Sequence, residues 1–402
     1  MAWGRNMKAQ NRARNDRLAD LIAQLQGEPL WRASLGSMEL FHSNMLEYLA
    51  LSFPEAAKTV LSLRPDPSQK ETSVERERRH LDLIVKLSGR RSLVIENKLF
   101  DFPRAQQLID YKQGLPPALR ESSLVLLSLM DPPTGGMPAG WEHLSYGELG
   151  RRLMNRFAST ADFSRQLMEH WGQLCVLLQE LAGALGLRDD PRERFDLSSV
   201  VVGIQELEEA RLRPFAVKLR AHQLLHRITD ALGSDAGRFA LASGYTNGSA
   251  LLEGFVTLND EDEVGWQLQG NQWRLAVRMR KDTPLYGRGE ALRKGREDRV
   301  RQRYIGHMDF SLLDEWGLTT AGGEGRRKFL HFAPDFVYQR RILVDPTVGQ
   351  LVELAARTSR RRGYLLRSGT PTSCGQPCTR GMPPIRAFVG IGSAATACST
   401  SR

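Results

Sequence analysis

Cysteine is scarce in this chain, and long apolar runs are missing from it. Only four of the 402 residues are cysteine: Cys175 stands in an amphipathic stretch, and Cys374, Cys378 and Cys398 lie near the C-terminus. This pattern excludes a disulfide framework and fits a reducing compartment. The longest apolar stretches, such as Ser123–Met130, fall far short of the roughly 18 residues that a membrane span requires. The N-terminus also has no apolar signal segment, so we expect a cytoplasmic protein without a membrane span.

Acidic residues are absent from the last part of the chain. From Ser359 onward there are seven arginines and no Asp or Glu, so this tail supplies +7 of the formal net charge of +10. The remaining chain carries only +3, which makes overall basicity weak evidence for a nucleic-acid partner. The tail is rich in Gly, Ser, Thr and Pro without periodicity, a composition that cannot bury enough apolar surface to become ordered. We therefore expect residues 359–402 to be a disordered basic tail. We expect no zinc site at its cysteines, since no second ligand pair lies near them.

The whole chain has the composition of an ordinary globular protein, with 41% hydrophobic and 25% charged residues. At 402 residues it is longer than a single hydrophobic core usually supports, so several domains are expected. Helical spacing of apolar residues, strand-like alternation and turn residues divide it into elements. The predicted helices are Lys8–Gln26, a helix capped by Ser37 and ended by Pro54, one from Pro103 to Gln113, Leu144–Phe157, Asp162–Leu187, Val200–Leu232 and Thr347–Thr358. The predicted strands are Thr72–Glu77, Leu81–Leu87, Ser92–Lys98, Ser123–Leu129, Val264–Leu268, Trp273–Met279 and Phe329–Ile342.

This order of elements predicts an α/β fold in several parts. Residues 1–158 read as an α/β core with a mixed central sheet flanked by helices. Residues 159–235 form a helical section, and residues 236–358 a small strand-rich C-terminal region. The pair Gly270-Asn271 is a typical hairpin tip within that last region.

Two neighbouring strands of the predicted core carry ionisable residues in an otherwise apolar setting. Asp82 stands in the apolar strand Leu81–Leu87, where an unpaired carboxylate costs several kcal/mol to bury. The apolar run of the next strand ends in Glu96-Asn97-Lys98, and alternation places Glu96 and Lys98 on the same face. If the two strands pair through the turn at Gly89, Asp82 lies close to Glu96. Two carboxylates beside a lysine suit a hard divalent cation and leave an ammonium to handle water or phosphate.

This arrangement resembles the PD-(D/E)XK nuclease superfamily, whose motif is an acidic residue on one strand and (Asp/Glu)-x-Lys on the next. Glu96-Asn97-Lys98 matches the second half of the motif. The wider similarity includes the preceding helix at Glu39–Leu46 and the following helix segment with Gln107 and Tyr111, which are four residues apart and share a helical face. In the motif that names the superfamily a proline precedes the acidic residue, whereas here Leu81 precedes Asp82.

The resemblance implies a restriction-endonuclease-like core and a role for each matched residue. Asp82, Glu96 and the main-chain carbonyl of Asn97 would hold Mg²⁺, for which Mn²⁺ could substitute, and Glu39 would add a carboxylate directly or through water. Lys98 would orient the attacking water and stabilise negative charge on the phosphate. The implied activity is Mg²⁺-dependent hydrolysis of phosphodiester bonds in nucleic acid, with DNA preferred. Gln107 and Tyr111 would support the site or touch the nucleic-acid backbone.

Other interpretations of these residues stay open. Asp82 and Glu96 could form a buried ion-pair network with Lys98 or Arg79, and Glu39 could serve only the dipole of its helix. His42 and His80 are more typical of core or surface positions than of a general base. The chain could also be an inactive nuclease relative that binds nucleic acid or protein, or an interaction protein that acts through its long helices.

A basic segment in the C-terminal region offers a second place for nucleic acid. Between Arg278 and Arg303 there are ten Lys or Arg and four Asp or Glu, with Tyr286 and Tyr304 near its ends. Such a segment could follow phosphates, and binding would then depend strongly on salt. A solvated helix face over Glu290–Arg303 explains the same composition.

Overall fold

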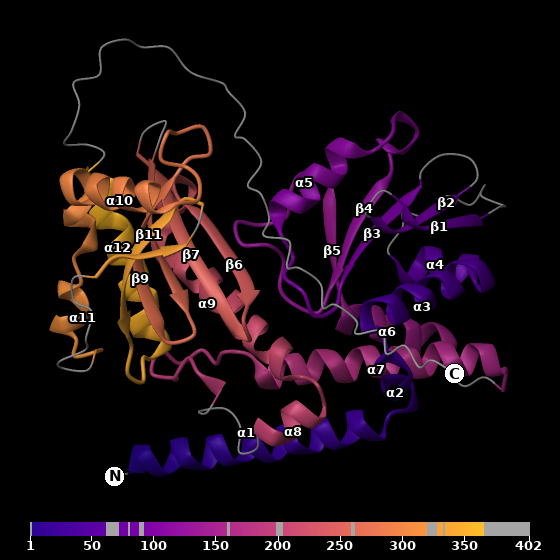
Figure 1. Cartoon of the computed structure of the whole chain (residues 1–402). Helices are drawn as coiled ribbons and strands as arrows, with labels where there is room; N and C mark the ends of the chain where they lie inside the picture. Colours follow the sequence, from indigo (N-terminus) through magenta and orange to yellow (C-terminus); the bar gives the residue numbers. More distant parts are fainter. Residues whose placement is uncertain are drawn as a thin grey trace, which may run out of the picture. The chain divides into compact units, whose positions relative to one another are not determined.

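The computed structural model describes residues 2–61, 72–78, 81–87, 92–158, 161–197, 204–258, 262–319, 328–332 and 334–365 (Figure 1). Within these residues the fold is α/β, with one mixed and one antiparallel sheet. No helix among them is both long enough and apolar enough to cross a membrane. The part of the predicted tail after residue 365 and its cysteines lie outside the described residues, as do His80 and Gly89.

The first sheet is mixed and has the strand order β1-β2-β3-β4-β5. The three strands that precede α5 pair antiparallel, and the pairing of β2 with β3 is the one that the sequence suggested; β3, β4 and β5 run parallel to one another. Parallel strands need a crossover between them, and α5 (Ala105–Gly114) lies in the connection from β3 to β4. The strands are β1 (Thr72–Arg78), β2 (Leu81–Leu87), β3 (Leu93–Lys98), β4 (Ser123–Ser128) and β5 (Trp141–Ser145).

Strand β5 corrects one prediction. The predicted helix Leu144–Phe157 begins two residues later, because Leu144 and Ser145 belong to β5. Ser145 is the N-cap of α6 (Tyr146–Phe157), and its side chain accepts a hydrogen bond from the backbone N–H of Glu148. Strand and helix therefore meet without a loop, which a helical reading of the apolar spacing could not reveal.

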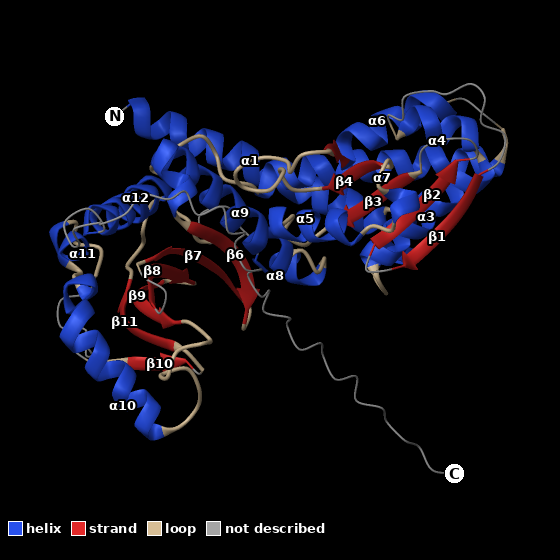
Figure 2. Ribbon diagram, turned by 90° about the horizontal axis from the view of Figure 1, so that it is seen from above, coloured by secondary structure: helices blue, strands red, loops and turns tan. Residues whose placement is uncertain are grey.

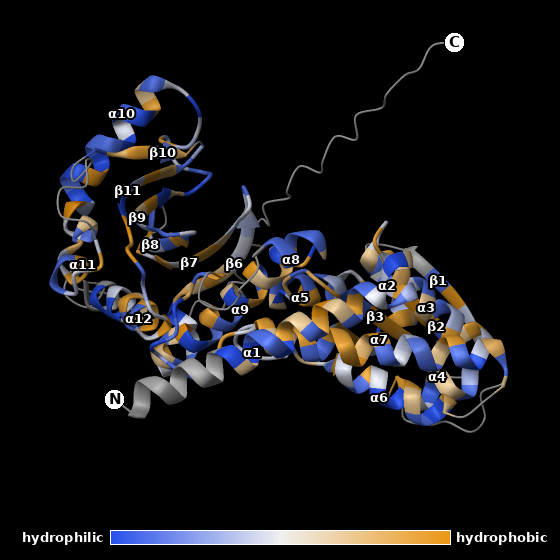
Figure 3. Ribbon diagram, turned by 90° about the horizontal axis from the view of Figure 1, so that it is seen from below, coloured by the Kyte–Doolittle hydropathy of each residue, from blue (hydrophilic) through white to orange (hydrophobic). Residues whose placement is uncertain are grey.

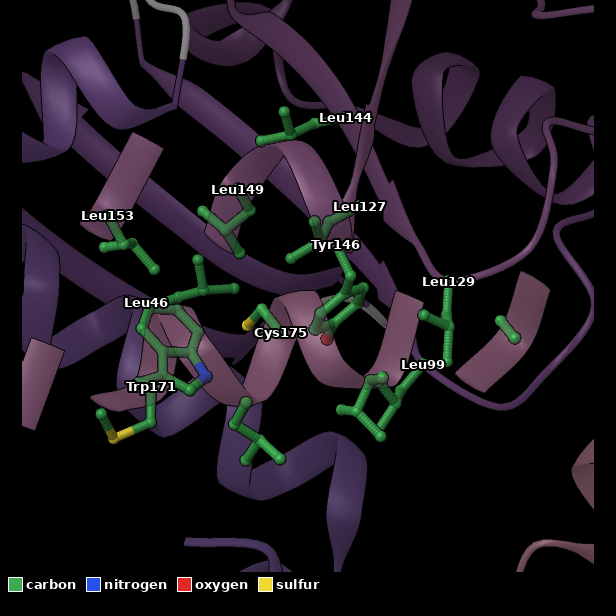
Figure 4. Packing of buried hydrophobic residues seen from close by; sticks show 14 of the residues in the cluster. Leu46, Leu99, Leu127, Leu129, Leu144, Tyr146, Leu149, Leu153, Trp171 and Cys175 are labelled. Atoms are coloured by element: carbon green, nitrogen blue, oxygen red, sulfur yellow. The ribbon is translucent and has the colours of Figure 1, made fainter. Parts of the chain in front are cut away.

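Each face of the first sheet is covered by a different set of helices. Leu83, Leu93 and Ile95 pack in one core with α3 (Met38–Ser52), α6 and α7 (Phe163–Leu185). Figure 4 shows Leu46, Leu149, Leu153 and Trp171 of these helices together with Leu127 of β4. Ile84 and Val94, one residue along each strand, pack on the opposite face with Leu108 of α5. Burial on both faces explains why β3 begins with the apolar run Leu93-Val94-Ile95, without polar alternation.

The other helices of the N-terminal half include two outside the predicted list. The predicted helix Lys8–Gln26 is longer, and the segments α2 and α4 are additional short helices that begin at proline. Ser37 is the N-cap residue of α3, although its side chain makes no cap hydrogen bond. The bounds are α1 (Ala2–Gly27), α2 (Pro29–Ser34) and α4 (Pro54–Val60), with a short 3₁₀ turn at Pro117–Leu119.

The predicted helix Val200–Leu232 is in fact two helices. They are α8 (Ile204–Glu209) and α9 (Arg213–Leu232), and residues 198–203 lie outside the described part. Arg211 between them has a φ of 57°, which a continuous right-handed helix does not allow. Pro214 stands in the first turn of α9, where a missing N–H is tolerated.

The second sheet is antiparallel and has the order β10-β11-β9-β8-β7-β6. Its apolar face packs against α9 and α12, which lie on the same side of the sheet (Figure 2), with Trp266 and Trp273 stacked 5.1 Å apart in the core. The strands are β6 (Ala240–Thr246), β7 (Ser249–Thr257), β8 (Asp262–Gln269), β9 (Gln272–Met279), β10 (Leu330–Phe332) and β11 (Phe336–Ile342). The remaining segments are α10 (Glu290–Arg299), α11 (Ser311–Glu315) and α12 (Val348–Leu365), with short turns at Gly233–Arg238, Val300–Tyr304 and Ile305–Met308.

Two predictions for this region are wrong in their bounds. The predicted strand Phe329–Ile342 is a hairpin of β10 and β11, because the turn contains Pro334, which cannot donate to a strand ladder. Helix α12 continues past the predicted start of the tail at Ser359. The Ser359 side chain is buried and accepts a hydrogen bond from Trp266 Nε1 at 3.0 Å. The predicted hairpin tip at Gly270 is confirmed between β8 and β9.

Candidate active site

Asp82 and Glu96 lie on paired strands at the same end of their ladder. The register pairs Leu83, which follows Asp82, with Ile95, which precedes Glu96. The carboxylate of half-buried Asp82 accepts a hydrogen bond from the backbone N–H of Asn97 at 2.6 Å. The strand pairing that the sequence suggested therefore brings these two acidic residues together.

Glu96 and Lys98 form an ion pair, as their alternation on β3 predicted. Lys98 Nζ lies 2.7 Å from Glu96 Oε1, and the Glu96 side chain is only 1% exposed. Both residues share the face of Val94, which packs under α5. The pair is therefore held in a nearly dry environment, where its charges are weakly screened.

Burial sets the protonation behaviour of this pair. It raises the pKa of Glu96 to about 8, and the nearby positive charge of Lys98 only partly offsets this effect. Burial lowers the pKa of Lys98, but the charge and hydrogen bond of Glu96 outweigh it, so the lysine pKa rises overall. We hold that Lys98 stays an ammonium throughout and that Glu96 is the partner that titrates.

The second carboxylate oxygen of Glu96 makes the pair chemically incomplete. Oε2 is buried and has no hydrogen-bond partner among the described residues. A buried oxygen of this kind costs free energy unless a cation or water contacts it. Together with Asp82 and the main-chain carbonyl of Asn97, it fits the all-oxygen donor set of a Mg²⁺ site. Within the described part of the chain, however, no three His, Cys, Asp or Glu side chains are grouped closely enough to hold a metal ion.

Glu39 lies near the centre but is not gathered with the two strand carboxylates into a ligand group. It stands in the first turn of α3 and is half-buried. Burial raises its pKa; the charges of Lys98 and Lys218 lower it, and those of Asp101 and Asp82 raise it further. Glu39 thus shares the electrostatic field of the centre, and of its two predicted roles the one through water suits this placement better.

Gln107 and Tyr111 share one face of α5, as predicted. Gln107 Nε2 donates to Tyr111 Oη at 2.5 Å. The pKa of Tyr111 is raised, first by burial and then by the charge of Glu96. This face of α5 is therefore directed towards the Glu96 side of the sheet.

Three neighbours of the centre were missed by reasoning from the sequence. Ser43 and Tyr146 contact the Asn97 side chain, and Lys218 of α9 donates to Asp101 Oδ1 at 3.1 Å and to the Phe100 carbonyl at 3.2 Å. Ser43 could have been found, because it stands four residues after Glu39 on the same helical face. Tyr146 and Lys218 carry no such local signal, since both reach the centre through long-range packing.

Several rival candidates have ordinary structural roles. His42 is fully buried and accepts a hydrogen bond from Trp171 Nε1 at 3.1 Å, and burial lowers its pKa to about 3. It is a neutral core residue. In the basic segment, Arg278 pairs with Glu263, Arg299 pairs with Asp262, and buried Arg296 donates to three backbone carbonyls.

The remaining basic residues of that segment are mostly exposed, and two of them, Arg293 and Lys294, lie on hydrophilic α10, which is largely blue in Figure 3. Exposure to solvent is a sufficient reason for these residues to be basic.

Comparison with known proteins adds no constraint on this site. No protein family model, no curated protein and no solved structure matches the chain.

Proposed function

We propose that the chain is a Mg²⁺-dependent nuclease of the PD-(D/E)XK type with a restriction-endonuclease-like core. One observation carries the proposal: the buried Glu96 carboxylate is paired to Lys98 through one oxygen, beside Asp82, and leaves its second oxygen unpartnered. The order of α3, three antiparallel strands, α5 and a parallel fourth strand also agrees with the resemblance. A purely structural ion pair has no need of an open carboxylate oxygen.

Each residue of the centre then has a part in phosphodiester hydrolysis. Asp82, Glu96 and the carbonyl of Asn97 would hold Mg²⁺ or Mn²⁺, with Glu39 acting through water. When bound, the ion supplies Lewis acidity and lowers the pKa of a coordinated water. Lys98, freed from part of its contact with Glu96, donates hydrogen bonds to the attacking water and to the phosphate oxygens.

Gln107 and Tyr111 support the open side of this centre. Their side chains are hydrogen-bonded to each other on α5, and the Tyr111 hydroxyl lies within the field of Glu96. A paired amide and phenol can donate to a nucleic-acid backbone without selecting a base. The proposed substrate is nucleic acid, and DNA is our preferred interpretation.

A second candidate function is an inactive nuclease relative that binds nucleic acid or protein. The observation in its favour is that only two side-chain carboxylates converge at the centre, without a third metal-ligating side chain in the described residues. An interaction protein acting through its long helices is less well supported. Helices α7 and α9 both carry many fully buried residues and so belong to the cores.

The proposal is tested by cleavage of circular and linear DNA with purified wild type and Lys98→Ala in Mg²⁺, Mn²⁺ or EDTA. We expect wild type to cut only with metal and Lys98→Ala to lose at least roughly 100-fold in rate, because the lost ammonium stabilises developing charge. Lys86→Ala is a matched control, since Lys86 is a strand lysine paired with Glu75 away from the centre. Equal cutting by wild type and Lys98→Ala would assign the activity to another site or a contaminant. No metal-dependent cutting by folded wild type, on varied DNA and RNA substrates, would contradict the nuclease proposal and favour the binding protein.

A further inference from the structure

The side chain of Asn97 is buried and uses both ends of its amide. Nδ2 donates to the Glu39 carbonyl and to Ser43 Oγ, each at 3.2 Å, and Oδ1 accepts from Tyr146 Oη at 2.5 Å. An amide group offers two N–H donors and one carbonyl acceptor, so each has a partner here. Asn97 is 1% exposed, Ser43 5% and Tyr146 0%, so water does not compete for these bonds.

The backbone of the same residue holds the neighbouring strand. Its N–H donates to the Asp82 carboxylate at 2.6 Å, a charge-assisted bond of the stronger kind. Asn97 also stands between Glu96 and Lys98 on β3. One residue therefore joins β2, β3 and the first turn of α3, which carry all three acidic residues of the centre.

Tyr146 is held rigidly enough to fix Asn97. It is the first residue of α6, directly after the N-cap Ser145. Its ring packs edge-on against His42 of α3, with centroids 5.1 Å apart, and lies among apolar residues including Leu99 and Cys175 (Figure 4). A phenol ring held on this many sides can place its hydroxyl in only one direction.

We infer that Tyr146 and Ser43 are positioning residues that clamp the Asn97 side chain and thereby set the spacing of Asp82, Glu39 and Glu96. The expected effect on metal binding rests on the proposed function. The contact network itself does not. Removal of a group that hydrogen-bonds to metal ligands and orients them typically lowers metal affinity by roughly 10- to 100-fold.

The test compares Tyr146→Phe, which removes only the hydroxyl, with Tyr48→Phe as a matched control. Tyr48 is a partly buried tyrosine on α3, and its ring packs against Phe53 away from Asn97. Two quantities are measured on the full chain. They are the hydrogen-exchange rate of the backbone N–H of Asn97 without metal, and the dissociation constant for Mn²⁺ alone. Thermal denaturation checks that each variant is folded, and Ser43→Ala replaces Tyr146→Phe if the latter does not fold.

The inference expects Asn97 exchange in Tyr146→Phe to be roughly tenfold faster, the effect of losing one ordinary hydrogen bond. It also expects Mn²⁺ binding to be roughly tenfold weaker or more, with no change in Tyr48→Phe. Unchanged exchange at Asn97 would overturn the clamp. Faster exchange with Mn²⁺ affinity equal to wild type would overturn its positioning role. If wild type binds no Mn²⁺, the proposed metal function fails, while faster exchange in Tyr146→Phe still supports the clamp.

Discussion

At the scale of the residue, Glu96 decides how the centre responds to pH. Burial raises its pKa to about 8, close enough to neutral pH for Glu96 to gain a proton, which would weaken its ion pair with Lys98. A cation that binds this carboxylate must displace that proton. A metal ion at the proposed site would therefore compete with this proton for one buried carboxylate, whose Oε2 has no protein partner among the described residues.

This competition predicts a pH dependence of metal binding. As pH falls below the pKa of about 8, the ionised fraction of Glu96 falls tenfold for each unit. The observed affinity for Mn²⁺ should therefore rise by roughly tenfold per unit from about pH 6 to 8 and level off above it. Titration calorimetry at several pH values measures this slope, together with the proton released on binding. An affinity that stays constant over this range would contradict a titrating Glu96 at the metal site.

At the scale of the element, much of the centre followed from local patterns. Alternation on β3 correctly placed Glu96 beside Lys98, and helical spacing correctly placed Gln107 beside Tyr111. These predictions succeed because each pair lies on one element whose period is fixed by backbone geometry. Tyr146 could not be found in this way, because it reaches Asn97 from 49 residues away through the packing of α6.

Short elements were the harder part of the fold to predict. Strand β5 has five residues and leads directly into α6, so its last two residues, Leu144 and Ser145, fell within the predicted helix. The same holds for the break between α8 and α9 at Arg211, where a single change in backbone conformation divides one apolar pattern. Periodicity needs a longer window than these features offer.

Helices α6 and α7 approach each other through a pair of glycines. A Cβ at Gly150 would lie 2.5 Å from the Gly172 carbonyl oxygen, and a Cβ at Gly172 would lie 2.9 Å from the Gly150 carbonyl oxygen. Neither backbone can yield without separating the helices. Because α6 begins with Tyr146, this contact also supports the position of the tyrosine above Asn97.

Gly150→Ala should therefore destabilise the protein by roughly 1–3 kcal/mol or more, because the extra methyl group overpacks the helix contact. Gly183→Ala is the matched control: Gly183 is exposed in α7, and its Cβ would meet nothing within 4 Å. There the substitution should stabilise by about 0.5–1 kcal/mol, since alanine favours the helix. Thermal or denaturant unfolding measures both variants. Equal stability of Gly150→Ala and wild type would show that the two helices can separate at little cost.

At the scale of the whole molecule, helix α9 belongs to both large cores. Phe215 and Leu219 in its first half pack in the core of the first sheet, whereas Leu225 and Ile228 pack in the core of the second. The described residues all belong to one compact unit. The sequence predicted a helical section at residues 159–235 between two other parts, but it did not indicate that one helix would be shared.

A buried ion pair lies where the two cores meet on α9. Arg220 and Glu193 are 3.0 Å apart, with side chains 1% and 0% exposed, and Arg220 also donates to the carbonyls of Arg194 and Phe195. Breaking such a pair leaves an unpaired buried charge and typically costs 3–5 kcal/mol. The middle of α9 is therefore bound to the segment that follows α7. Separating α9 from either core would cost the free energy of this ion pair.

We expect the two cores to unfold together, because α9 cannot leave one core without disturbing the other. Calorimetry should show a single transition whose calorimetric and van 't Hoff enthalpies agree. Leu219→Ala and Leu225→Ala, one in each core, should each destabilise that same transition by roughly 2–5 kcal/mol. Each should also shift it as a whole, without splitting it. Two separate transitions, of which Leu219→Ala shifts only one and Leu225→Ala only the other, would contradict the shared helix and divide the chain into independent domains.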